Sequence, residues 1–148
     1  MDGKVASLTA MRVFDGWTST EVRRLARVAD LAEVDAGETL VRTGAWHAGC
    51  YILLSGAVVT TTPDGSRLIT AAGEFVGLPE TLAGVAAQGD SVAMRASTVL
   101  AFTTNTFFVA LDEIRSLRKL ALEELAVAQV APRQARPVAP VLAMAPTS

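Results

Sequence analysis

The 148-residue sequence has little cysteine and little histidine: Cys50 and His47 are the only ones. A single cysteine cannot form an internal disulfide, so we expect a reducing compartment and a cytoplasmic protein. His47 and Cys50 lie three residues apart, but a metal site needs more ligands than these two, so we expect no metal. With one histidine and no nucleophile elbow, a hydrolytic triad has no support either. We therefore do not expect an enzyme.

Long apolar runs and a strong net charge are also missing. No segment approaches about 18 uninterrupted apolar residues, so we expect no membrane-spanning segment. The N-terminus likewise has no apolar run long enough for a secretory signal. Thirteen Lys and Arg stand against 15 Asp and Glu, a net charge of −2. This balance offers no strong field for nucleic acid or an anionic membrane.

What the sequence does have is apolar residues, at 51% of the chain, enough for one domain with a core. Residues 1–30 are predicted to form an N-terminal helical segment. Thr18 is followed three residues later by Glu21, the pattern of a capping box. One apolar helix face follows it, made by Val22, Leu25, Ala26 and Ala29. Its arginines, at positions 23, 24 and 27, are interpreted as a solvated face rather than a partner surface.

Residues 31–104 change to the pattern of about eight short β-strands. The strongest strand signal is CYILLSGAVVTTT, and Gly56 within it indicates a bulge or a sharp bend. The pair Asp64-Gly65 between two strand-like runs predicts a hairpin. Many short strands with turn signals between them favour a sandwich or a barrel over a parallel sheet.

Residues 105–130 are predicted to form a C-terminal helix, with Asn105 or Thr104 as its N-cap. An apolar stripe on this helix either packs on the β domain or mediates self-association, and the sequence leaves both open; it consists of Leu111, Ile114, Leu117 and Ala121. Residues 131–148 hold four of the six prolines, a spacing that excludes a helix. We interpret them as a flexible or extended tail, with a docking peptide as the alternative.

Four motifs agree in order along the chain: VFDGWTSTEVRRLA, then Gly37-Glu38 and Gly44 before YILLSG, then AAGEFVG, then VLAFTTNTFFVAL. Together they resemble the cyclic nucleotide-binding domain superfamily, whose bacterial members include the sensor half of the catabolite activator family. The resemblance covers about residues 8–125. It implies a mainly β fold with flanking helices, an eight-stranded antiparallel jelly roll, with a ligand mouth bridged by a short helix.

The resemblance also places a phosphate-binding cassette at residues 73–96. The family cassette supplies a glutamate for the ribose hydroxyl and an arginine for the phosphate, because a buried phosphate needs a charge-assisted partner. Here Leu78 and Asp90 stand at those two positions. The candidate pocket residues implied in this way are Gly77, Leu78, Glu80, Thr81, Asp90, Ser91 and Val92.

The loop is about two residues longer than in the catabolite activator family, so a shifted register is the alternative. In that register Glu80 would serve the ribose and Arg95 the phosphate. Successive strand residues point to opposite faces, so Arg95, five residues beyond Asp90, is expected to face away unless a bulge intervenes.

Two functional hypotheses follow. The leading one is a stand-alone, non-enzymatic regulatory or protein-interaction module with a degenerate pocket and no cofactor. The alternative is a genuine sensor that binds a cyclic nucleotide or another metabolite. The DNA-binding relatives continue into a helix-turn-helix domain for which this chain leaves no room, so we expect no nucleic-acid binding by the chain alone. A protein partner or self-association is expected instead.

Overall fold

Two antiparallel four-stranded sheets form the centre of the computed structural model, which describes residues 3–46 and 49–130. The first sheet has the order β1-β8-β3-β6 and the second the order β2-β7-β4-β5. The strand bounds are β1 Asp30–Val34, β2 Thr39–Val41, β3 Cys50–Ser55, β4 Val58–Thr61, β5 Arg67–Thr70, β6 Phe75–Val76, β7 Ser91–Ala93 and β8 Ser97–Phe102. A mainly β fold with eight strands in the described part of the chain is as predicted; the jelly-roll connectivity stays a prediction.

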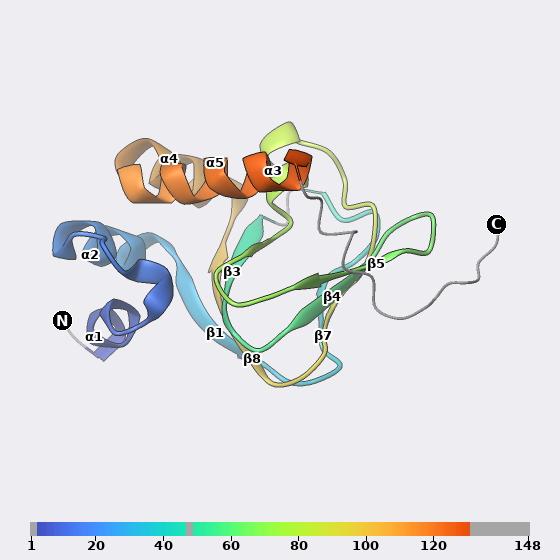
Figure 1. The fold of residues 1–148 in the computed structure, drawn as a ribbon, viewed down its shortest axis with the longest axis horizontal. Coiled ribbons are helices and arrows are strands. Elements are labelled where there is room, and N and C mark those ends of the chain that lie inside the picture. Colours follow the sequence, from blue (N-terminus) through green and yellow to red (C-terminus); the bar gives the residue numbers. More distant parts are fainter. Residues whose placement is uncertain (1–2, 47–48, 131–148) are drawn as a thin grey trace.

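Helices flank the sheets at both ends of the chain. Figure 1 shows α4 and α5 lying across the top of the strands, with α1 and α2 beside β1. Their bounds are α1 Gly3–Thr9, η1 Arg12–Phe14, α2 Ser19–Val28, α3 Leu78–Ala83, α4 Thr104–Glu113 and α5 Arg115–Val130. Within the described ranges, no helix combines the length and the apolar character needed to cross a membrane. The predicted tail, residues 131–148, lies outside the described residues.

The first sheet is covered on both faces, which explains why β3 is an unbroken apolar run. Ile52 and Leu54 point into a large core shared with the helices, while Leu53 points toward the second sheet. The same alternation holds in β8, where Leu100 faces the helices and Val99 faces the second sheet. A strand with only one buried face would show polar residues at every second position.

The core between the two sheets is much smaller than the core under the helices. Its buried members are Val41, Leu53, Val58, Val76 and Val99. These side chains fill only part of the space between the sheets.

Phe107 of α4 joins the helices to the first sheet. Its ring is fully buried and makes edge-to-face contacts with Phe102 of β8, at 5.2 Å between centroids, and with Phe75 of β6, at 6.0 Å. Such contacts add to the free energy gained by burying the rings themselves. Phe107 therefore fixes α4 against β6, the strand at the start of the predicted cassette.

The two predicted turns in the strand region are confirmed. Gly56 lies between the end of β3 and the start of β4 with φ of 100°, and a Cβ there would lie 2.1 Å from Ser97 Oγ. Only glycine fits this corner, because both the backbone conformation and the close approach exclude a side chain. The Asp64-Gly65 pair forms the β4–β5 hairpin, closed by Thr62 N–H donating to the Ser66 carbonyl at 2.8 Å.

The C-terminal helix differs from the prediction in two ways. It is two helices, α4 and α5, separated at Ile114, which has extended backbone angles. The N-cap is Thr103 rather than Thr104 or Asn105: its hydroxyl accepts from Thr106 N at 3.1 Å, and Thr106 Oγ1 accepts from Thr103 N at 3.0 Å. In this capping box a threonine, Thr106, takes the third position, which is usually Glu or Gln, so the sequence pattern did not indicate Thr103 as the N-cap.

The predicted apolar stripe packs within the chain. Ile114, Leu117 and Ala121 are at most 4% exposed and belong to the core under the helices, and the half-buried Leu111 packs against them. Of the two alternatives for this stripe, the structure shows packing on the β domain rather than an exposed surface for self-association. Self-association through another surface stays a prediction.

Glu21 joins the N-terminal segment to α5. It completes the predicted capping box by accepting from Thr18 N at 3.0 Å, while Thr18 Oγ1 accepts from Glu21 N. The same carboxylate accepts from Ser116 N at 3.0 Å and Ser116 Oγ at 2.8 Å, in the first turn of α5. Partial burial alone would raise the pKa of Glu21, but these hydrogen bonds together outweigh it and lower the pKa below its ordinary value of 4.5.

Replacing Phe107 with alanine is expected to lower the free energy of unfolding by about 3–5 kcal/mol, because a buried ring leaves a cavity. Urea unfolding followed by circular dichroism measures this loss. Phe108→Ala is the matched control: its ring is 44% exposed and should cost much less. Equal losses in the two variants would contradict the assigned packing.

Glu21→Gln is expected to cost about 1 kcal/mol at neutral pH, since it weakens hydrogen bonds at two helix N-termini. Because the pKa is lowered on folding, the contribution of the carboxylate is present above pH 4.5 and is lost as the pH falls below that value. The variant should therefore lose less stability than the parent between neutral and acid pH. The control Glu123→Gln changes an exposed residue of α5 and should follow the parent profile.

Candidate functional site

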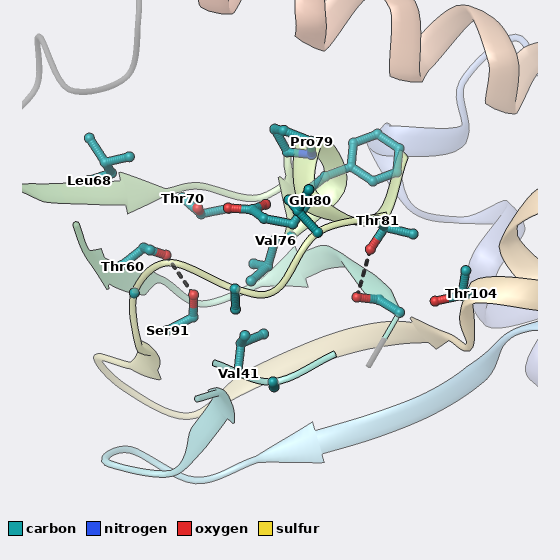
Figure 2. Close-up of a pocket in the computed structure, with 17 residues that line it drawn as sticks. Val41, Thr60, Leu68, Thr70, Val76, Pro79, Glu80, Thr81, Ser91 and Thr104 are labelled. Carbon is teal, nitrogen blue, oxygen red and sulfur yellow. Dashed lines mark hydrogen bonds between the residues drawn. The ribbon is translucent and has the colours of Figure 1, made fainter. Parts of the chain in front are cut away.

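A cavity of about 120 Å³ lies at one end of the space between the two sheets, beside the small inter-sheet core. Figure 2 shows its walls, which come from strands of both sheets, from α3 and from the start of α4. Three kinds of side chain line it among the described residues: apolar groups, hydroxyl groups and one ionisable group, Glu80. The hydroxyls belong to Thr60, Thr70, Thr81, Ser91 and Thr104.

The sequence after β6 builds the upper wall of this cavity. Gly77 is the N-cap of α3 with φ of 82°, Pro79 lies in the first turn, and Gly84 is the C-cap with φ of 71°. Proline at the start and glycine at the end limit α3 to six residues. The short helix that the resemblance implied over the ligand mouth is therefore present at residues 78–83.

The loop after α3 is held by backbone contacts to neighbouring strands. Gly44 N–H donates to the Ala87 carbonyl at 2.7 Å, and Ala87 N–H donates to the Ala45 carbonyl at 3.0 Å. Gly89 passes so close to β4 that a Cβ there would lie 1.6 Å from the Thr61 carbonyl oxygen. The loop so held leads into β7 with Ser91 on the cavity wall.

The hydroxyl groups differ in how they are satisfied. Thr60 and Ser91 are cross-strand partners whose hydroxyls lie 2.7 Å apart, and Thr81 Oγ1 donates to the Gly49 carbonyl at 2.9 Å. Thr104 Oγ1 is buried and has no hydrogen-bond partner among the described residues. An unpaired buried hydroxyl is costly, and in a native structure it often marks a place for a ligand or a water molecule.

Of the two residues predicted near the ribose position, only Glu80 lines the cavity. Leu78 is fully buried in the core under the helices. Leu78 and Leu82 are four residues apart on α3 and both pack against that core, so the helix turns Glu80 to the other side. Figure 2 shows the Glu80 side chain reaching from α3 toward Thr70 on β5.

Asp90, at the family's arginine position, points out of the cavity. Its Oδ1 accepts from Thr43 N at 2.7 Å and from Thr43 Oγ1 at 2.8 Å, and the residue is exposed. These hydrogen bonds, backbone first, lower the pKa of Asp90, and nearby Arg42 contributes. The carboxylate is therefore a structural link between the cassette and the loop after β2.

The remaining predicted positions also fall into two groups, those that line the cavity and those that do not. Gly77, Thr81 and Ser91 line the cavity with Glu80. Val92 is half-buried in β7, where it pairs with Val59 and Thr39, and does not line the cavity. Arg95, the alternative phosphate contact, is exposed beyond the end of β7 and does not line the cavity either.

Several lining residues were not predicted, and they come from distant parts of the sequence. Thr60, Leu68 and Thr70 lie on β4 and β5, Val41 on β2, and Thr104 on α4. The one signal that could have found them is the run of hydroxyl residues in strands, since Thr60 lies opposite Ser91 in the sheet. Using that signal would have required the strand order in advance.

The structure brings no metal-ligand cluster together in the described ranges, where no group of three or more His, Cys, Asp or Glu could hold an ion. His47 lies outside those ranges. Burial raises the pKa of Cys50 to about 12, with the charge of Glu124 adding to the shift and a hydrogen bond with Thr81 opposing it. The thiol is therefore protonated and buried beside the cavity wall.

Comparison with known families identifies the class of protein. The family model of the cyclic nucleotide-binding domain matches residues 31–113, which is more than half of the chain. The chain belongs to this family, as the motifs predicted. No curated protein sequence matches the chain.

Solved structures share the fold. A regulatory subunit of a cAMP-independent protein kinase A from Trypanosoma brucei superimposes with a TM-score of 0.68 at 22% identity, covering 89% of this chain and 48% of that one. A mutant cAMP-binding acyltransferase from Mycobacterium smegmatis gives 0.63 at 21% identity, covering 70% of this chain and 34% of that one. The sensor domain of the transcriptional regulator DNR from Pseudomonas aeruginosa gives 0.61 at 19%, covering 83% and 87%. This chain thus spans a third to a half of the first two proteins.

The Cys50 thiol is expected to resist alkylation in the native protein. With a pKa of about 12, only about one molecule in 10⁴ carries a thiolate at pH 8, and the group is also buried. Iodoacetamide labelling followed by mass spectrometry should be slow in buffer and fast in denaturing urea. Native labelling at the rate of a free cysteine would contradict this placement.

Proposed function

We propose that this domain is a non-enzymatic regulatory or protein-interaction module that does not bind cAMP or cGMP by the family's charge pairing. One observation carries the proposal: no Lys or Arg lines the cavity among the described residues, and its one ionisable side chain is a carboxylate. At the two positions where the resemblance implies charged contacts, Leu78 packs in the core and the Asp90 carboxylate accepts a hydrogen bond from Thr43 N.

The electrostatic cost for a cyclic nucleotide is substantial. A nucleotide phosphate about 4 Å from the Glu80 carboxylate would be repelled by about 4 kcal/mol at an effective dielectric constant of about 20. A buried phosphate without a cationic partner adds a desolvation cost of a few kcal/mol. Together these correspond to a loss of several powers of ten in affinity.

The size of the cavity supports the same conclusion. At about 120 Å³ it is smaller than the range of about 300–1,000 Å³ usual for sites that enclose drug-sized ligands. The cavity is partly open to solvent, so its walls would enclose only part of a nucleotide. One of these walls is held by the backbone hydrogen bonds between Ala87 and the loop after β2, at Gly44 and Ala45.

A regulatory module needs a physical connection between its site and another surface. Here the carboxylate of Glu124 on α5 accepts from Phe75 N at 3.1 Å and 3.2 Å, near the start of the cassette. A change at the cavity would therefore reach α5 directly. A related fold occurs in the regulatory subunit of a kinase described as cAMP-independent, which supports regulation without cAMP.

Isothermal titration with cAMP and with cGMP tests the proposal. We expect no binding tighter than about 100 μM, because the phosphate has no cationic partner in the cavity. A catabolite activator-type protein titrated in the same buffer serves as the positive control. A micromolar dissociation constant for either nucleotide would overturn the proposal.

The alternative, a genuine small-ligand sensor, is favoured by one observation: the cavity exists and is lined by hydroxyl groups and by Glu80. In the shifted register, this glutamate would accept a ribose hydroxyl. The titration with cAMP and cGMP decides whether the ligand of such a sensor is a cyclic nucleotide.

A further inference from the structure

The cavity is partly open to solvent, and apolar side chains lie at its mouth. Val85, which lines the cavity, is 43% exposed, and Trp46, next to the lining residue Ala45, is 58% exposed. Pro79 on α3 and Leu68 on β5 add carbon surface to the same lining. Exposed apolar groups gathered at a cavity are typical of a surface that binds a partner.

Glu80 gives this surface a charge. It is half-buried at the cavity wall, and its side chain makes no hydrogen bond or ion pair with any described residue. An ionised carboxylate only accepts hydrogen bonds, and a guanidinium group can donate two of them in parallel. No Lys or Arg lines the cavity among the described residues, so a cation that pairs with Glu80 comes from outside this lining.

The end of α5 lies close to the cavity. Glu124 of α5 accepts from the backbone of Phe75, a lining residue, at 3.1 Å. Val130, the last residue of α5, is six residues further along, a distance of about 9 Å in a helix. The 18 residues that follow, 131–148, span up to about 60 Å when fully extended. The chain after α5 therefore starts near the mouth and is long enough to cross it.

The charge of residues 131–148 complements that of the β domain. They contain Arg133 and Arg136 and no Asp or Glu, a side-chain charge of +2. Residues 31–103 carry seven Asp and Glu against three Lys and Arg, a net charge of −4. Attraction between the two favours contact, and Glu80 is the carboxylate of the β domain that lines the cavity.

The apolar part of the same segment complements the apolar mouth. After Arg136 and Pro137 the sequence is VAPVLAMAP, with no charged residue. Proline-rich peptides favour an extended conformation, and protein surfaces with exposed aromatic side chains bind them in that conformation. Such a preference also lowers the entropy lost on docking.

We propose that residues 131–148 dock across the mouth of the cavity, with an arginine side chain on Glu80 and the apolar residues after it against Val85 and Trp46. The inference rests on the proposed function, because it names the partner of the same cavity, a segment of this chain. Tethering gives the segment an effective concentration on the order of millimolar at the mouth, so a weak contact suffices. A protein that captured the segment would uncover the site.

Paramagnetic relaxation enhancement in the isotope-labelled full-length protein tests the docking. A nitroxide on Ala143→Cys is selective, because Cys50 is buried and resists labelling. We expect the amide signals of Val85 and Ala87 to lose at least half of their intensity. Those of α2, at the opposite end of the fold from β5, should keep theirs (Figure 1). Added salt should restore the signals at the mouth, because it screens an accessible ion pair.

Two variants and one control locate the contact. Glu80→Gln should weaken the broadening at the mouth, because it removes the carboxylate of the ion pair. The double variant Arg133→Gln, Arg136→Gln should weaken it as well, from the other side of the pair. Glu33→Gln changes an exposed carboxylate of β1 that does not line the cavity, so it should match the parent. A thermal melt of each variant confirms that it folds.

A mixing experiment distinguishes docking within one chain from docking between two copies. Isotope-labelled protein without a nitroxide is mixed with unlabelled protein that carries the nitroxide on Ala143→Cys. We expect no broadening in this mixture. Broadening would overturn the inference, since the occupant would then be the segment of a second copy.

The remaining outcomes separate this inference from the proposed function. Full signal intensity at the mouth, or broadening unchanged in Glu80→Gln and in the double arginine variant, would overturn the inference alone. Titration of cAMP into the double arginine variant tests the proposed function with the segment released. We expect no binding tighter than about 100 μM there either, because the cavity itself lacks a cation. Micromolar binding would overturn the proposed function, whatever the broadening shows.

Discussion

The burial of Phe75 is the interaction on which the site depends. Its ring packs edge-to-face on Phe107 in the core under the helices, and its backbone N–H donates to the Glu124 carboxylate of α5. Side chain and backbone are thus held by two different helices. The next residues, Val76 and Gly77, enter the cavity wall directly. A strand of only two residues would be marginal without these constraints, because its ladder hydrogen bonds alone cannot order it.

Glycines shape the backbone of the cassette, while the side chains between them point in different directions. Gly77, Gly84 and Gly89 preserve the turns and the close approach of the loop to β4. The helix between the first two glycines turns Leu78 into the core and Glu80 into the cavity, and Asp90 caps the loop after β2. Leu78 and Asp90 therefore stabilise the scaffold through contacts outside the cavity.

Two glutamates connect α5 to other parts of the fold. Glu124 links α5 to β6 at the start of the cassette, and Glu21 links the first turn of α5 to the N-terminal segment. Both links are carboxylates that accept from backbone N–H groups, an arrangement stronger than neutral hydrogen bonds. A ligand that displaced α3 would act on Phe75, and through Glu124 on α5.

The sequence by itself determined what depends on neighbouring residues: the Thr18–Glu21 capping box, the Asp64-Gly65 hairpin, the Gly56 corner and the number of strands. It also determined the family, because several motifs agree in order. Only the tertiary structure decided which way Leu78, Glu80 and Asp90 point, and that Thr60 and Thr104 share the cavity with the cassette. The physical reason is that the direction of a side chain on a six-residue helix or a loop is set by what packs against it. Those partners, from the core under the helices to the Thr43 backbone, lie far away in the sequence.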